Sequence, residues 1–137
     1  GIGAVLFSVL YNSRIKDIVF SYDRVLNFDG ETGPYVQYTH ARCNSVLKKA
    51  GAYDGGEVDY SGISDEESSE VVKLIASFPE AVKAAAEKYE PCFVARHLVS
   101  LAQSYTRAEN QKRARASDNG SQKRFGKRTC PFGHCRA

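Results

Sequence analysis

The stretch from Gly30 to Gly51 is the sequence feature that most constrains the fold, because it carries both a start signal and a stop signal for one long helix. Thr32 is a suitable N-cap residue, and Pro34 suits the first turn because its missing N–H would be unpaired there. Gly51 can adopt the left-handed conformation that ends many helices, and two lysines precede it where positive charge is favourable. The sequence therefore predicts a helix across this segment.

This helix has two distinct faces. At about 100° per residue, one stripe is apolar and is expected to pack, and it consists of Val36, Cys43, Leu47 and Ala50. A second stripe, displaced by roughly 130°, combines two tyrosine rings with a guanidinium group and consists of Tyr35, Tyr38 and Arg42. Stacking rings and a planar guanidinium are typical of surfaces that grip unstacked nucleobases. The residues alone leave open whether these tyrosines bind bases or are ordinary aromatic residues at the edge of the core.

The rest of the chain also predicts helices; residues 17–20 are compatible with a short extended piece, and no longer strand pattern competes. Apolar residues recur at helical spacing in residues 2–12, 71–78, 82–89 and 94–105, and a shorter helix is expected within residues 22–28. Ser64 and Glu67 have the spacing of a capping box, and Pro79 and Pro91 each suit the start of a helix. Short connections favour antiparallel neighbours, so the expected fold class is an all-α helical bundle.

Composition divides the chain near residue 107. Residues 1–106 hold 10 Lys/Arg and 14 Asp/Glu, whereas residues 107–137 hold 9 Lys/Arg and 2 Asp/Glu. Leu101 is the last Leu, Ile or Val, so residues 108–137 are predicted to be a disordered basic tail. We expect no membrane partner because the chain has no apolar run of about 18 residues. Four scattered cysteines favour a reducing compartment, and the cytoplasm is the expected location.

The tail contains one pattern that suggests a metal site. Cys130, His134 and Cys135 are zinc-ligand types, but the spacing of the cysteines is long and no second pair of ligands accompanies them. We therefore expect no metal there.

Three separated segments resemble arginyl-tRNA synthetases, in the same order as in that family. Gly33-Pro34-Tyr35-Val36-Gln37-Tyr38-Thr39-His40-Ala41-Arg42 is similar to the family's Pro-Tyr-x-Gln-Tyr-x-His-x-Arg helix. Residues 1–7, GIGAVLF, resemble the passage from the catalytic domain to the anticodon-binding helices, and residues 74–107 resemble the helices that follow. The resemblance covers roughly residues 1–107 and implies a DALR-type anticodon-binding domain. It divides the chain into a junction helix (1–16), the helical domain (17–107) and the tail (108–137).

The resemblance implies a role in recognising the anticodon loop of arginine tRNA. The implied tRNA-binding residues are Tyr35, Tyr38, Arg42 and Gln37. His40 is expected to be packed or locally hydrogen-bonded, and no catalytic residue is expected. We expect a monomer whose partner is arginine tRNA and not DNA. The alternative hypothesis is a helical protein–protein interaction module whose basic tail binds nucleic acid incidentally.

Two features depart from the family pattern. The family's His-Ile-Gly-His-type and Lys-Met-Ser-Lys-type motifs are absent, so we expect a catalytically inactive piece of a longer ligase. No cofactor is expected in this chain, whereas ATP with magnesium is implied for the parent enzyme. The family also ends in a leucine-rich helix. Codons can be chosen for residues 123–137 so that reading one nucleotide later gives such a sequence, which predicts that the tail is translated out of frame. The coding DNA checks this prediction.

Overall fold

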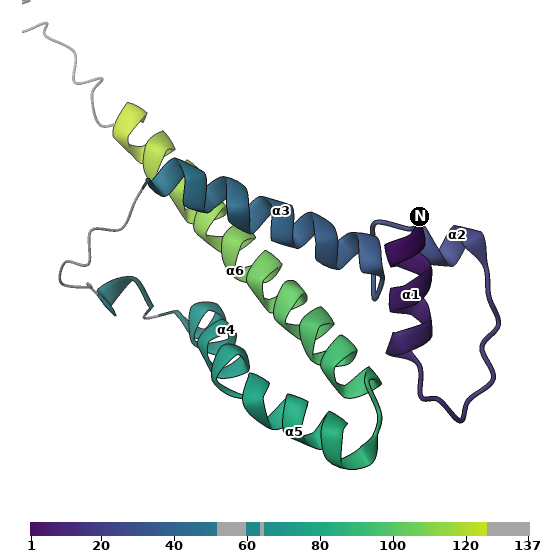
Figure 1. The fold of residues 1–137 in the computed structure, drawn as a ribbon. Coiled ribbons are helices and arrows are strands. Elements are labelled where there is room, and N and C mark those ends of the chain that lie inside the picture. Colours follow the sequence, from purple (N-terminus) through teal and green to yellow (C-terminus); the bar gives the residue numbers. More distant parts are fainter. Residues whose placement is uncertain (52–59, 64, 126–137) are drawn as a thin grey trace, which may run out of the picture.

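The protein is described by a computed structural model that covers residues 1–51, 60–63 and 65–125 (Figure 1). Within these ranges the regular elements are all helical, and no strand is present. The elements in chain order are α1 (Ile2–Tyr11), α2 (Tyr22–Val25), α3 (Gly33–Ala50), the 3-10 helix η1 (Tyr60–Ile63), α4 (Glu66–Ala76), α5 (Phe78–Lys88) and α6 (Cys92–Phe125). The predicted all-α fold class is confirmed.

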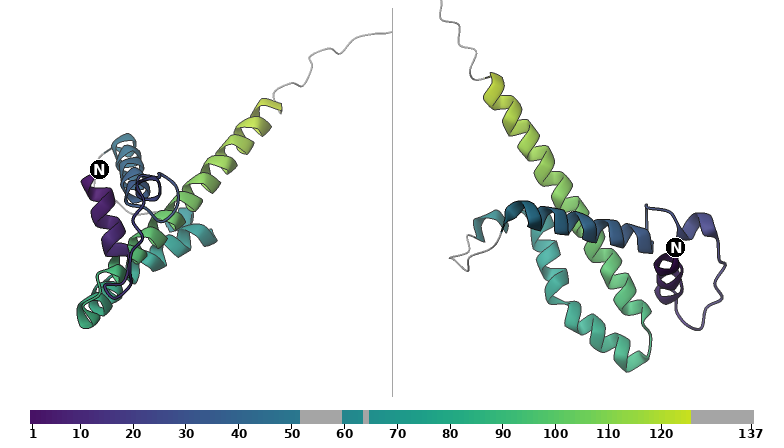
Figure 2. Two further views of the ribbon diagram at one scale, coloured as in Figure 1. Left: turned by 90° about the vertical axis from the view of Figure 1, so that its right-hand side faces the viewer. Right: turned by 45° about the horizontal axis from the view of Figure 1, so that its top comes forward.

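The long helix α6 is the centre of the arrangement. It contacts α1 and α3 on one side and α4 and α5 on the other, so it lies between them in the views of Figures 1 and 2. Its buried residues are mostly small, which lets neighbouring helices approach closely, and they are Cys92, Ala95, Val99, Ala102, Ser104 and Ala108. The core therefore follows one helix and is thin.

The ends of α3 form as the sequence predicts. The Thr32 side chain accepts a hydrogen bond from the Tyr35 N–H at 3.3 Å, and Pro34 lies in the first turn. The helix ends at Gly51, whose φ of 82° lies in the left-handed region that favours glycine. Local sequence signals thus determine the length of this helix.

Helix α1 crosses the first turn of α3 at close range. Gly33 is buried there, and a Cβ added to it would lie 2.9 Å from Phe7 Cβ and 3.2 Å from Ala4 Cα. A Cβ added to Gly3 would lie 2.9 Å from the side-chain nitrogen of Gln37. Gly33 therefore allows α1 to lie directly against the start of α3, whereas a Cβ on Gly3 would meet only the end of a flexible side chain.

Glu90 joins two parts of the chain that are distant in sequence. Its carboxylate accepts hydrogen bonds from the Ser13 hydroxyl at 3.1 Å and the Arg14 N–H at 3.4 Å. Burial opposes ionisation here, but these hydrogen bonds hold the pKa of Glu90 below its usual value. The turn before α6 is therefore fastened to the segment after α1.

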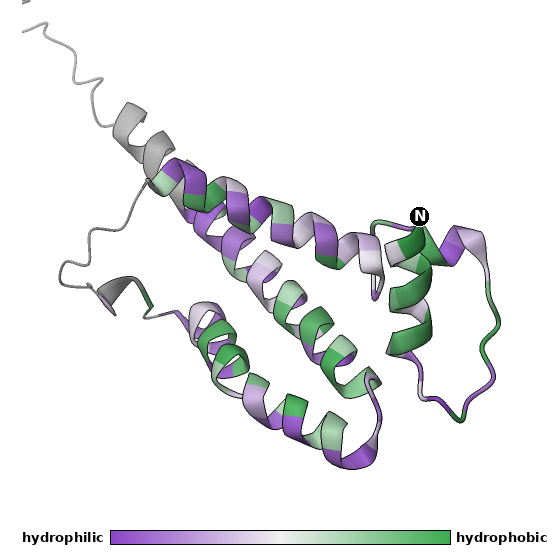
Figure 3. Cartoon of the chain, viewed as in Figure 1, coloured by the Kyte–Doolittle hydropathy of each residue, from purple (hydrophilic) through white to green (hydrophobic). Residues whose placement is uncertain are grey.

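The structure bears on two predicted boundaries. The N-cap of α4 is Asp65, whose side chain accepts from the Ser68 N–H at 3.0 Å, whereas the predicted capping residue Ser64 lies outside the described residues. Helix α6 extends beyond the predicted start of the tail at residue 108 and continues to Phe125, because this segment is rich in Ala, Arg, Lys and Gln, which favour helices. Figure 3 shows α6 changing along its length from hydrophobic beside α5 to hydrophilic beside the end of α3. Residues 126–137 lie outside the described residues.

Candidate nucleic-acid interface

Tyr38 presents the exposed ring of the predicted tRNA-binding set. It lies in the second turn of α3, and 54% of its surface is accessible. The Arg42 guanidinium, one turn later, lies 5.7 Å from the centre of the ring. This distance is within the range of a cation–π interaction. The ring is therefore backed by a cation on one side and open to solvent on another, which is suited to stacking on a base.

Arg42 also faces α6. Its guanidinium pairs with Glu109 at 2.8 Å, and both side chains are largely buried, with 23% and 20% of their surfaces exposed. The hydrogen bond from Arg42 to Glu109 raises the pKa of the guanidinium, although partial burial opposes this shift. Arg42 thus remains charged, and it links Tyr38 on α3 to a carboxylate on α6.

Tyr35 belongs to the contact between α3 and α6. It is half-buried, and its hydroxyl donates a hydrogen bond to Thr106 Oγ1 at 3.2 Å. The Thr106 hydroxyl in turn donates to the backbone oxygen of Ala102 at 2.9 Å. The structure therefore places Tyr35 on the packing side of α3, with Tyr38 at the edge of that side.

The predicted apolar stripe is wrong at its C-terminal end. Leu47 is 66% exposed and Ala50 is exposed, whereas Val36 and Cys43 are half-buried as expected. The face of α3 that packs on α6 instead includes polar side chains, because α6 supplies polar partners for them. Hydropathy on one helix could not reveal this, since the partners lie in a distant part of the sequence.

Gln37 and His40 lie away from this contact. Gln37 is exposed, and its amide lies beside Gly3 at the crossing with α1. His40 is exposed, and one of its ring nitrogens lies 3.2 Å from Asn44 Nδ2. Of the two expected alternatives, packed or locally hydrogen-bonded, the local hydrogen bond is therefore the one that the structure shows.

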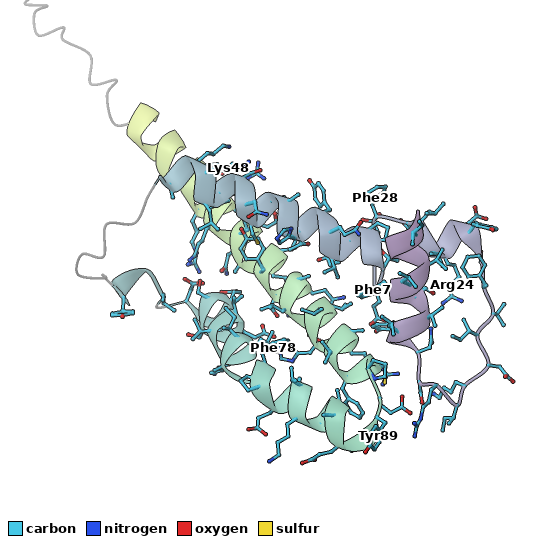
Figure 4. All side chains as sticks on the ribbon, viewed as in Figure 1. Phe7, Arg24, Phe28, Lys48, Phe78 and Tyr89 are labelled. Carbon is cyan, nitrogen blue, oxygen red and sulfur yellow. The ribbon has the colours of Figure 1, made fainter. Side chains whose placement is uncertain are left out.

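Positive charge gathers near the C-terminal end of α3. Lys48 and Lys49 are exposed in its last turn, and Figure 4 shows Lys48 at this end of the helix. Helix α6 adds exposed Arg113 and Arg115, four and six residues after Glu109. These cations lie at the opposite end of α3 from its first turn, so an anionic polymer that ran along α3 from Tyr38 toward Gly51 would approach them.

Two hollows in the described chain offer other candidate sites. A cavity of about 540 Å³ lies between α1 and the segment before α3, and Tyr11 is one of its lining residues. Burial, and to a smaller extent the hydrogen bond with Glu31, raises the pKa of Tyr11 to about 12. A groove of about 580 Å³ is mostly apolar and is lined by Val46, Ile63, Val71 and Tyr105. Neither contains Tyr38.

No metal-binding cluster and no helix able to span a membrane are found among the described residues. The cysteines and histidine considered for zinc, Cys130, His134 and Cys135, lie outside the described residues.

Glu109 and Thr106 are the residues of this surface that the sequence did not indicate. Both lie on α6, and nothing in their spacing connects them to α3. The composition of the chain predicts that the helical domain ends at residue 107, which places Glu109 in the tail. Only the packing of α3 on α6 reveals these partners.

Comparison with known proteins identifies close relatives. The arginine–tRNA ligases of Halothermothrix orenii and of Clostridioides difficile strain 630 are each 52% identical to this chain over 107 residues, which is 78% of this chain and 19% of each relative. The solved structure of Thermus thermophilus arginyl-tRNA synthetase superposes with a TM-score of 0.71 at 40% identity, covering 78% of this chain and 18% of that one. The chain thus spans about a fifth of the length of these relatives.

A family model covers most of the described chain. The model of the DALR anticodon binding domain matches residues 36–125, from the first turn of α3 to the end of α6. This match includes Tyr38, Arg42 and Glu109, and the helical architecture agrees with the superposed structure. The chain therefore belongs to the DALR anticodon-binding domain family.

Proposed function

We propose that the surface around Tyr38 contacts the anticodon loop of arginine tRNA, as part of a longer arginine–tRNA ligase. The observation that carries this proposal is the exposed Tyr38 ring backed by the Arg42 guanidinium. Single-stranded loops are recognised by stacking of their unpaired bases on aromatic side chains, and this ring is free to stack. Family membership and relatives that are arginine–tRNA ligases support the choice of RNA.

The remaining site residues have graded roles in this proposal. Tyr38 stacks on a base, and Arg42 supports the ring through its cation–π contact. Tyr35 holds the binding face of α3 against α6 through its hydrogen bond to Thr106. Gln37 precedes Tyr38 in the sequence and is exposed. None of these residues performs chemistry, because their task is to bind and orient RNA.

The parent enzyme would join arginine to its tRNA at the expense of ATP, with magnesium, in a catalytic domain outside this chain. We propose that the domain described here is a monomer without a cofactor and acts in the cytoplasm. Its contribution to the reaction is recognition of the correct tRNA.

Filter binding of arginine tRNA and of a second tRNA at physiological salt tests the proposal. Stacking on one aromatic residue contributes about 1–3 kcal/mol, so Tyr38→Ala should weaken binding of arginine tRNA by roughly 5- to 150-fold. Tyr38→Phe keeps the ring and should bind nearly as well as the unchanged chain. Tyr22→Ala removes another exposed ring, on α2, and serves as the matched control.

The competing outcome is equally clear. Equal, weak and salt-sensitive binding of both tRNAs, unaffected by Tyr38→Ala, would support the protein–protein module with incidental nucleic-acid affinity. Circular dichroism of each variant establishes that the helices remain folded.

A further inference from the structure

Glu109 is the carboxylate partner of Arg42, and its own hydrogen bonding is incomplete. One oxygen, Oε1, pairs with the guanidinium at 2.8 Å. The other oxygen, Oε2, is buried and has no hydrogen-bond partner among the described residues. An unpartnered buried carboxylate oxygen is costly, so this pair is an imperfect structural contact.

The position of Glu109 matters for any anionic ligand of this surface. Arg42 connects Glu109 to Tyr38, because its guanidinium contacts both the Tyr38 ring and the Glu109 carboxylate. The other groups that influence Arg42 electrostatically are the phenol groups of Tyr38 and Tyr105, and neither is a carboxylate. Glu109 is therefore the negative charge that faces Arg42 across the contact between α3 and α6.

Charge neutralisation has a direct consequence for RNA binding. A cation that meets a phosphate releases a condensed counterion, and this release drives much of the affinity of proteins for nucleic acids. An arginine already paired with a carboxylate contributes less, because its charge is compensated before the RNA arrives.

We propose that Glu109 lowers the affinity of this surface for RNA by occupying Arg42, so that its removal frees the guanidinium to contact the RNA backbone. This inference rests on the proposed function of the Tyr38 surface. Glu109 also lies in the segment that the sequence predicts to be read out of frame, so a carboxylate here need not have been selected for binding. Glu109 is thus a determinant of affinity that does not itself touch the RNA.

Glu109→Gln in the full chain tests the inference, because it removes the charge and keeps the shape. Binding of arginine tRNA is measured over a range of salt concentrations. The variant should bind several-fold more tightly at low salt. Its slope of log affinity against log salt should steepen by about 0.7 to 0.9, the value for one additional phosphate contact.

Two controls separate this effect from a general change in charge. Glu70→Gln removes a carboxylate that pairs with Arg107 at 3.2 Å on the α4 side, and it should leave binding almost unchanged. In an Arg42→Gln background, Glu109→Gln should have no effect, because the guanidinium that it would free is absent. If Glu109→Gln unfolds in the assay, Glu109→Ala carries the same expectation.

The outcomes are distinguishable. Weaker or unchanged binding by a folded Glu109→Gln variant would overturn the inference, and weaker binding would show that the pair positions Arg42 and Tyr38. An equal gain in Glu70→Gln, or in the Arg42→Gln background, would also overturn it. A chain in which Tyr38→Ala has no effect would instead refute the proposed function.

Discussion

The crossing of α1 and α3 allows a sharp test of which glycine the packing requires. A Cβ on Gly33 would lie 2.9 Å from Phe7 Cβ, 3.2 Å from Ala4 Cα and 3.3 Å from the backbone oxygen of Gly3. Two of these atoms belong to the α1 backbone, so a change of rotamer cannot relieve the clash. A Cβ on Gly3 would also lie 2.9 Å from its nearest neighbour, but that neighbour is the end of the flexible Gln37 side chain.

The same substitution should therefore have opposite effects at the two positions. Overpacking typically costs about 1–3 kcal/mol, whereas Ala in place of Gly stabilises a helix by roughly 0.5–1 kcal/mol. Gly33→Ala should lower the free energy of unfolding by roughly 1–2 kcal/mol, since α1 must move away from α3. Gly3→Ala should be neutral or should raise it by up to about 1 kcal/mol, because Gln37 can rotate.

Urea denaturation followed by far-ultraviolet circular dichroism measures both variants. With a typical slope of about 1–3 kcal/mol per molar urea, a difference of about 2 kcal/mol separates the two midpoints by roughly 1 M. Equal shifts for the two variants, or a Gly33→Ala protein at least as stable as the unchanged chain, would show that the backbone contact does not limit packing at this crossing.

Three further predictions concern local interactions. Hydrogen bonds from the Ser68 side chain and N–H hold the pKa of Asp65 below its usual value, so the stabilising effect of Asp65 is complete above about pH 4 and is lost as pH falls through the lowered pKa. Asp65→Asn should therefore flatten the acidic part of a plot of urea midpoint against pH. A plot that Asp65→Asn leaves unchanged would contradict this assignment. Burial, and to a smaller extent the hydrogen bond with Cys43, raises the pKa of Tyr105 to about 12. The free energy of unfolding should therefore fall as pH rises from about 10 through 12. Tyr105→Phe should remove one tyrosine from the late phase of an absorbance titration, and a loss from the early phase would refute this. Thr32→Ala should cost about 1 kcal/mol in urea denaturation because the cap of α3 is lost, whereas Thr32→Ser should retain most of it, and equal losses in the two would exclude the hydroxyl as the cap.

The boundaries of α3 could be predicted because they depend on neighbours in the sequence. The hydroxyl of Thr32, the fixed φ of Pro34 and the permissive φ of Gly51 act within one turn of the helix end. The start of α4 was less certain for the same reason. Ser64 and Asp65 are both good capping residues, and the structure uses Asp65. Local signals thus locate a helix reliably and its first residue less reliably.

The packing of α3 could not be predicted from its own residues. Helical phase correctly grouped Tyr35 and Arg42, but it assigned them to a face separate from the core. In the structure both contact α6, because Thr106 and Glu109 accept hydrogen bonds from them. Leu47, which hydropathy placed in the core, is exposed. A polar partner more than sixty residues away changes which face packs, and this information is absent from any local window.

This arrangement changes what the candidate surface is. Tyr35 and Tyr38 differ by about 60° around the helix axis, so when Tyr35 packs against α6, Tyr38 stands at the border between α3 and α6. A base stacked on Tyr38 would then lie next to α6 as well as α3. Residues of α6 that never touch RNA can consequently alter binding through Arg42, which is paired across that border. The affinity of this domain should therefore depend on the register of two helices, and changes on α6 near Glu109 should affect binding more than equal changes on the outer face of α3.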